Sequence, residues 1–79
     1  MLKIDGHDNA VIGTALVWAN QARTEVLVYD GATIVGNLIK QQGMTLDEAH
    51  EYIDFNIEGA YVGDETPIVL WKCDLDELE

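Results

Sequence analysis

The chain has 79 residues, with 15 Asp and Glu against 4 Lys and Arg, and its formal net charge is -11. A charge of this size repels nucleic acids and anionic membranes, which excludes direct binding to either as the main activity and favours cationic partners. Hydrophobic residues form 48% of the chain. This is too many for a disordered acidic protein, so we expect one small domain over residues 1–79.

The acidic residues are concentrated in the second half of the chain. Residues 1–40 contain four acids and three cations, whereas residues 41–79 contain eleven acids and one cation, Lys72. The last residues, 73–79, form an acidic tail. The single cysteine, Cys73, excludes an internal disulfide and fits a reducing compartment. With no signal-peptide pattern and no membrane-spanning apolar run, we expect a cytoplasmic protein.

The first half predicts two strands. Residues Ala10–Trp18 form a short, almost wholly apolar run that favours a buried strand, although periodicity alone leaves a helix open. Residues Ala19–Thr24 are polar and are typical of a hairpin loop. Residues Glu25–Asp30 alternate as a strand does, with Val26, Val28 and Asp30 on one face and Leu27 and Tyr29 on the other. In the preceding segment, His7 lies beside two acids and could help to bind a metal ion. Because the sequence offers no second cluster of metal ligands, we expect His7 to be a solvated turn residue.

A first helix is expected over Ala32–Gln42. Its apolar residues recur at helical spacing, Asp30 can cap its start, and Gly43 is placed to end it. Gly36 lies inside this helix, where glycine costs about 1 kcal/mol relative to alanine. We therefore expect Gly36 to pack closely against a neighbouring backbone.

A second helix is expected from Leu46 to about Ala60. Thr45 and Glu48 have the spacing of a capping box, in which each side chain bonds the other residue's backbone N–H. The apolar face is formed by residues three or four apart: Leu46, Ala49, Ile53, Ile57 and Ala60. A second set with the same spacing forms what we call the acidic ridge: Asp47, Glu51, Asp54 and Glu58. These four acids fall within about 60° of one another around the helix axis.

Residues Thr66–Trp71 predict a third strand, and Pro67 belongs at its start because proline cannot donate a ladder hydrogen bond. The order is then β-β-α-α-β. A three-stranded antiparallel sheet with both helices on one face would bury both apolar stripes, which predicts an α+β fold.

Nothing in the sequence favours catalysis. The chain has no serine, and the only thiol, Cys73, has an acidic neighbour, which raises a thiol pKa. His50 lies among acids on the second helix, as surface histidines commonly do. The glycines form no phosphate-binding pattern, and no calcium loop is present. We expect a protein that is not an enzyme and that has no cofactor and no metal site.

The acidic ridge has two interpretations. It can be a solvated face that keeps a small protein soluble. It can also be a surface that mimics DNA, because carboxylates at this spacing recur every ~5–6 Å, an interval comparable to that of the phosphates along one DNA strand. Like charges four residues apart destabilise a helix slightly, so a mixed-charge face would have been the more stable way to remain soluble.

The chain resembles a family of small acidic phage and prophage proteins. The shared motifs include a "VLVYD" strand, a "GM-[ST]" helix start and the pattern "F-N-I-x-G-A-Y-V-G-x-x-T-P-I", preceded by "IDG" and "IG" segments. The matching positions are Ile4 to Gly6, Val11 to Gly13, Val26 to Asp30, Gly43 to Thr45, Glu48 and Ala49, Glu51 and Tyr52, Phe55 to Ile57, Gly59 to Gly63, and Thr66 to Ile68. The shared Asn56, Gly59, Ala60, Gly63, Thr66 and Pro67 look structural.

Some members of this kind are anti-CRISPR proteins, and this chain looks similar to those directed at type I-C systems. The resemblance implies an inhibitor in the cytoplasm of a bacterial host that occupies the basic DNA-binding surface of a Cascade-type interference complex. The residues expected to contact that partner are Asp47, Glu51, Asp54, Glu58, Asp64, Glu65, Asp74, Asp76 and Glu77.

Two further hypotheses remain open. The chain could instead bind a small molecule or nucleotide in a pocket near Asn56, Tyr61 and Trp71. Independently, the free edges of a three-stranded sheet favour a homodimer, with β-branched segments such as Thr66–Trp71 pairing across a two-fold axis.

Overall fold

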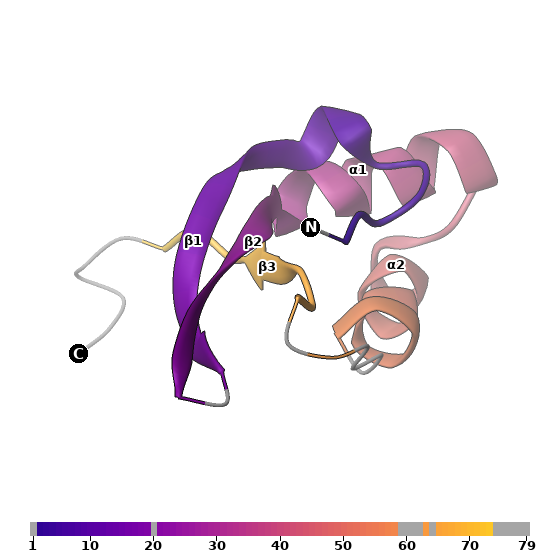
Figure 1. The fold of residues 1–79 in the computed structure, drawn as a ribbon. Coiled ribbons are helices and arrows are strands. Elements are labelled where there is room, and N and C mark those ends of the chain that lie inside the picture. Colours follow the sequence, from indigo (N-terminus) through magenta and orange to yellow (C-terminus); the bar gives the residue numbers. More distant parts are fainter. Residues whose placement is uncertain (1, 20, 59–62, 64, 74–79) are drawn as a thin grey trace.

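The computed structural model describes residues 2–19, 21–58, 63 and 65–73, and Figure 1 shows their arrangement. A short 3-10 turn, η1, precedes the hairpin, and a π-helical turn, η2, follows the second helix. The elements in chain order are η1 (Asp8–Ala10), β1 (Val11–Ala19), β2 (Ala22–Asp30), α1 (Gly31–Gln42), α2 (Leu46–Ile53), η2 (Asp54–Glu58) and β3 (Ile68–Leu70). The predicted α+β class and the order β-β-α-α-β are confirmed.

The sheet is mixed, so the expectation of a purely antiparallel sheet is wrong. Its strand order is β1-β2-β3. β1 pairs antiparallel with β2, from Val11 opposite Tyr29 to Ala19 opposite Ala22. β3 pairs parallel with β2, with Val28 opposite Ile68. The reason is the connection: the chain leaves β2, passes through both helices and returns to the same sheet, and a crossover of this length joins parallel strands.

The β1–β2 hairpin is longer and its connection shorter than expected. β2 begins at Ala22 rather than Glu25, and Gln21 takes a left-handed backbone with φ of 65°. Residues 10–18 are largely a strand and not a helix, but that strand is not buried. Ile12, Leu16 and Trp18 are 51%, 56% and 74% exposed. α1 packs against α2, η1 and β2, and β1 has its main contacts with β2 alone among the described elements.

The core lies between β2 and the two helices. Tyr29, Ile34, Ala49 and Ile53 are all fully buried in one cluster, to which Leu38 also belongs. The Tyr29 hydroxyl also accepts a hydrogen bond of 2.8 Å from the backbone N–H of Ile4, which ties the N-terminal segment to the sheet. Val26 and Val28 are buried as well, so both faces of β2 are covered.

Two of the predicted helix end signals, the capping box and Gly43, act as expected. In the capping box, the Glu48 N–H donates to Thr45 Oγ1 at 3.2 Å and the Thr45 N–H donates to Glu48 Oε1 at 2.9 Å. Gly43 ends α1 with φ of 67°, a left-handed conformation that glycine adopts without strain. Asp30 precedes α1 without capping its backbone, and its carboxylate accepts from the Thr33 hydroxyl at 2.7 Å.

The second helix ends earlier than expected. Regular α-helix stops at Ile53, and residues 54–58 continue as a π-helical turn. Ala60, the expected helix end, lies outside the described residues. Leu46, expected on the buried face, is 57% exposed. The turn before β3 is closed by Thr66, whose N–H and hydroxyl both donate to the Gly63 carbonyl, at 3.2 and 2.6 Å.

Close packing occurs at Gly31 and not at Gly36. Gly36 is exposed, and a Cβ added there would have no neighbour within 4 Å. A Cβ added at Gly31 would lie 2.5–2.8 Å from three ring atoms of Trp71. Trp71 also stacks on His50, with ring centroids 5.3 Å apart. The indole therefore joins the start of α1 to α2, and only glycine leaves room for it.

These two glycines give a matched pair of substitutions. We expect Gly31→Ala to lower the free energy of unfolding by about 1–3 kcal/mol, because the added methyl forces the Trp71 ring away from its stack. Gly36→Ala should raise it by up to about 1 kcal/mol, because alanine is the better helix former and meets nothing. Urea unfolding of the two variants measures both changes, and equal effects would contradict this packing.

Candidate functional site

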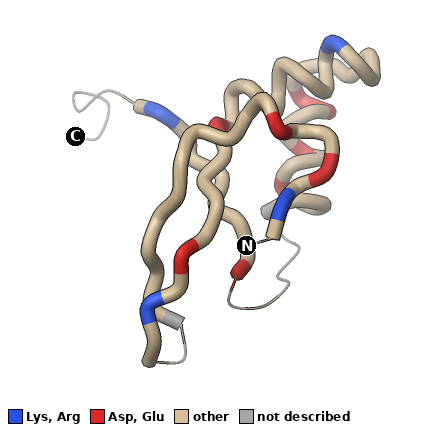
Figure 2. Tube along the Cα trace, turned by 45° about the horizontal axis from the view of Figure 1, so that its top comes forward, with Lys and Arg blue, Asp and Glu red and all other residues tan. Residues whose placement is uncertain are grey.

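The acidic ridge occupies the solvent side of α2. Asp47, Glu51 and Asp54 are exposed, whereas Ala49 and Ile53 on the same helix are fully buried. The backbone at Asp54 is still α-helical, with φ of -59° and ψ of -44°. These three acids therefore have the α-helical spacing that the sequence predicted. They extend over about 10 Å of the helix axis. Figure 2 shows acidic positions repeated along this helix and no basic ones.

The fourth member of the ridge, Glu58, lies at the end of η2. Its side chain lies outside the described part of the structure. A π-helical turn has i→i+5 bonds and therefore turns less per residue than an α-helix, so the α-helical spacing assumed for Glu58 does not continue past Asp54. Such turns are rare and occur frequently at functional sites.

The remaining predicted contact residues are only partly placed. Glu65 is exposed and lies within the turn that Thr66 closes before β3. The other four lie outside the described residues: Asp64, Asp74, Asp76 and Glu77. The structure therefore brings together three of the nine predicted site residues on one continuous helical segment: Asp47 and Glu51 on α2, and Asp54 at the first position of η2.

In the described part of the chain, no ion pair neutralises Asp47, Glu51 or Asp54. The sequence contains no Lys or Arg between Gln41 and Trp71. An ion pair of 3.6 Å joins Lys3 to Asp8 in the N-terminal segment, away from the ridge in the sequence. Carboxylates without a partner keep their full field toward solvent, so the outer side of α2 is a strongly negative surface.

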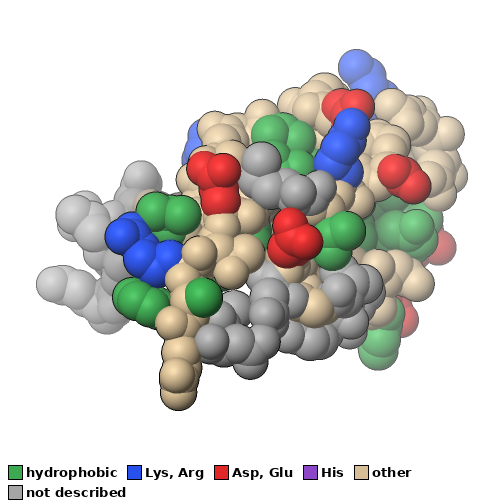
Figure 3. Space-filling model, in the orientation of Figure 1, with side chains coloured by type: hydrophobic (Ala, Val, Ile, Leu, Met, Phe, Trp, Pro, Cys, Tyr) green, Lys and Arg blue, Asp and Glu red, His purple; other side chains and the backbone are tan. Residues whose placement is uncertain are grey.

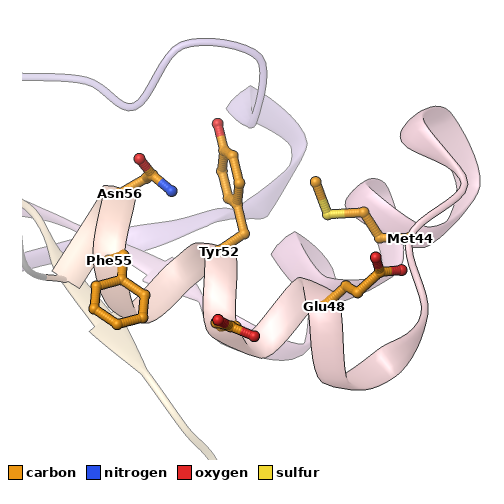
Figure 4. Close-up of a pocket in the computed structure, with 6 residues that line it drawn as sticks. Met44, Glu48, Tyr52, Phe55 and Asn56 are labelled. Atoms are coloured by element: carbon orange, nitrogen blue, oxygen red, sulfur yellow. The ribbon is translucent and has the colours of Figure 1, made fainter.

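A groove beside the ridge was not predicted. It has a volume of about 330 Å³ and is lined by Met44, Glu48, Glu51, Tyr52, Phe55 and Asn56. Figure 4 shows these side chains projecting from α2, from η2 and from the turn before α2. Phe55 is 74% exposed, which is unusual for so large an apolar side chain, and Tyr52 is 36% exposed.

The groove combines apolar and acidic groups. Glu51 belongs to both the ridge and the groove, and Glu48 lies one turn before Tyr52. The sequence contains the signal for this arrangement, since Met44, Glu48, Tyr52 and Phe55 follow one another at steps of four, four and three. That spacing places Glu48, Tyr52 and Phe55 on one helical face, next to the ridge and away from the buried face. Met44, in the turn before α2, also packs against the core.

The alternative small-molecule pocket is not assembled as expected. Asn56 lines the groove just described, but Trp71 packs on His50 and over Gly31 instead. Tyr61 lies outside the described residues. The interplanar angle between the Trp71 and His50 rings is 28°, so the indole forms part of the packing between α2 and the end of β3.

His7 is buried, so the expectation of a solvated turn histidine is wrong. It is only 8% exposed, and its Nδ1 accepts a hydrogen bond from Asn37 Nδ2 at 3.1 Å. The Asn37 amide is also paired with Asn9 through two hydrogen bonds, of 2.8 and 3.1 Å. Burial lowers the pKa of His7 below its ordinary value of 6.5, because the charged imidazolium loses its hydration.

Among residues 2–19, 21–58, 63 and 65–73, no three His, Cys, Asp or Glu side chains are grouped so as to hold a metal ion. In the same part of the chain, no helix has the length and apolar character needed to cross a bilayer.

Comparison with known proteins adds no assignment. No family model matches the chain, and no match was found among the curated proteins or the solved structures.

The buried His7 predicts a pH dependence of stability. The unfolded chain binds a proton near pH 6.5, whereas the folded chain binds it only at lower pH. Between these two pKa values the unfolded state carries more protons, so stability falls as pH drops below about 6.5 and is fully present above it. Urea unfolding between pH 5 and 8 measures this slope. His7→Gln should reduce it, while an equal slope in the variant and the unmodified protein would contradict the assignment.

Proposed function

We propose that this chain is an acidic interaction protein that binds the cationic DNA-binding surface of a CRISPR-Cas interference complex and so blocks target DNA. The observation that carries the proposal is the row of exposed, unpaired carboxylates Asp47, Glu51 and Asp54 on one helical face. The resemblance to small phage proteins supplies the class of partner. Because the chain looks similar to inhibitors of type I-C systems, a type I-C interference complex is the first partner to test.

The ridge has the charge spacing that such a surface requires. Successive carboxylates on one helical face are ~5–6 Å apart, and DNA carries one phosphate per ~3.4 Å of axis along each strand, with the backbone winding around that axis. Lys and Arg side chains that grip phosphates can therefore meet several carboxylates of one rigid helix. Burial of Ala49 and Ile53 keeps this helix from rotating the acids away from the partner.

The groove gives the partner a second kind of contact. A Lys or Arg that reaches Glu48 or Glu51 can lay its aliphatic stem along Tyr52 and Phe55. An Arg guanidinium also stacks favourably on aromatic faces, an interaction of about 0.5–1 kcal/mol at exposed sites. Such contacts depend little on salt, so a part of the affinity should survive where ionic pairing is screened.

A small-molecule site is the second candidate, and one observation favours it. The volume of the groove, about 330 Å³, is at the lower end of the range typical of ligand pockets. Its two carboxylates, Glu48 and Glu51, disfavour a nucleotide phosphate and favour a cationic ligand. Thermal-shift screening with nucleotides and with polyamines discriminates between the two, and stabilisation of several degrees by one of them would support this candidate.

Charge reversal tests the ridge. We expect the double variant Glu51→Lys and Asp54→Lys to weaken binding to a type I-C interference complex at least about tenfold, because it replaces attraction by repulsion at two adjacent contacts. The control, Asp5→Lys with Glu25→Lys, changes the net charge by the same amount at exposed acids outside α2. A DNA-binding competition assay reads out both, and equal inhibition by the two double variants would exclude this ridge as the contact surface.

Truncation of Phe55 tests the groove. We expect Phe55→Ala to weaken binding about two- to tenfold at both low and high salt, because its contact is not ionic. Glu51→Gln should instead lose its effect as salt rises. Leu46→Ala is the control, since Leu46 is a comparably exposed apolar residue of α2 that does not line the groove. If Phe55→Ala behaved like Leu46→Ala, the groove would have no part in binding.

A further inference from the structure

The outer edge of β1 is a long, uncharged sheet edge. The strand order β1-β2-β3 places β1 at one side, and no other strand of the described residues pairs with its outer edge. β1 has nine residues, Val11–Ala19, with the sequence VIGTALVWA, and none of them is charged. The opposite edge is formed by β3, which has only three residues.

This edge lacks most of the features that normally prevent sheets from joining. Natural edge strands are protected by charged side chains, prolines, bulges or short length. β1 has one such feature, a bulge between Val11 and Gly13, at the end that leads to η1. From Thr14 onward its pairing with β2 is regular, and the strand contains neither proline nor charge. The backbone N–H and C=O groups along this part are therefore a template for another strand.

Large apolar side chains along β1 strengthen this inference. Ile12, Leu16 and Trp18 are 51%, 56% and 74% exposed. Figure 3 shows hydrophobic side chains at the surface on the side of the molecule where Figure 1 places β1. Leu16 and Trp18 point to the same face of the sheet, because alternate residues of a strand share a face. Contact with a second strand would remove part of this apolar surface from water.

Charge favours a second copy of this chain as the occupant. Two copies with a net charge of -11 each repel one another wherever their acidic surfaces face. No residue of β1 is charged, and the ridge on α2 belongs to a different element of the fold. A partner selected by charge would instead be cationic and would go to α2, not to a neutral strand.

The side-chain pattern is also compatible with two-fold symmetry. If two β1 strands paired antiparallel about an axis through Leu16, each Trp18 would lie opposite a Thr14, a large side chain beside a small one. The two Leu16 side chains would then face each other at the axis. In the existing hairpin, Glu25 is the β2 partner of Leu16 and Arg23 is the β2 partner of Trp18. The Glu25 carboxylate accepts a hydrogen bond of 3.1 Å from the Thr14 hydroxyl of β1, so it stays engaged within its own hairpin.

We propose that the chain forms a homodimer in which β1 pairs antiparallel with β1 of a second copy, so that one continuous sheet runs through both. This differs from the pairing through Thr66–Trp71 expected from the sequence, because the strand there is only three residues long. The proposal does not depend on the partner of α2, and its test uses the isolated protein.

A charge placed at the axis tests the dimer. The unmodified protein should have twice the monomer mass of 8.8 kDa in sedimentation and light-scattering measurements at micromolar concentration. Leu16→Lys should shift it to a monomer, because two lysines would meet at the axis. Leu46→Lys is the matched control, since Leu46 is 57% exposed and lies on α2, and it should remain a dimer. Circular dichroism verifies the folding of both, and Trp18→Lys replaces Leu16→Lys if that variant does not fold.

Cross-linking tests the register. In a Cys73→Ser background, Leu16→Cys should form an intermolecular disulfide readily, and Leu46→Cys should not. A monomeric mass for the unmodified protein at 100 µM (roughly a hundredfold above a micromolar dissociation constant) would overturn the proposal. A dimer that persists in both Leu16→Lys and Trp18→Lys would also overturn it, since the contact would then lie elsewhere.

Discussion

The burial of Ala49 and Ile53 is the constraint on which the candidate site depends. These two side chains have no exposed surface, and they pack into the same cluster as Tyr29 and Ile34. Once they are in place, the rotation of α2 about its axis is determined, and Asp47, Glu51 and Asp54 must face solvent. The capping box at Thr45 determines where the helix begins. The two buried side chains and the capping box together hold the three acids in one row. An unfolded chain in water would not maintain that row.

The same constraint explains why the groove lies beside the ridge. Phe55 follows Ile53 by two residues, so it points well away from the core, and the π-helical turn begins between them. A chain that needed only solubility would place a polar residue there, whereas this one leaves Phe55 74% exposed next to two carboxylates. An exposed aromatic ring adjoining uncompensated acids is typical of a surface that binds cationic side chains. The solubilising interpretation of the ridge accounts for the acids but not for this ring.

Local sequence signals were sufficient to predict those helix and strand ends that depend only on neighbouring residues. The capping box at Thr45, the left-handed stop at Gly43 and the strand ending at Asp30 were all predictable, because each depends on residues within one turn. The three acids on α2 could be placed for the same reason. The groove was also within reach, since the spacing from Met44 to Phe55 is helical, but an apolar set outside the main stripe is easily overlooked.

The features that could not be predicted all depend on contacts between distant segments. The direction of β3 depends on the path of the chain through two helices, and the burial of His7 depends on Asn37, thirty residues away. Gly36 suggested close packing, yet the contact is at Gly31, because Trp71 from the end of β3 reaches that helix start. The apolar run in β1 predicted burial, and only the assembled sheet reveals that nothing described covers its outer edge.

The small size of the domain links this exposed strand to the proposed function. A chain of 79 residues can cover only part of its apolar surface. Here both faces of β2 are buried and both helices are used for the cluster around Tyr29, so β1 is left at the margin. The acidic residues on α2 do not cover the apolar surface of β1. Their mutual repulsion opposes the close approach of two copies at the acidic face of α2. Association through β1 would therefore add apolar burial without bringing the ridge of α2 into the contact. The strand can then supply the stability that the acidic helix does not, while α2 remains open to a cationic partner.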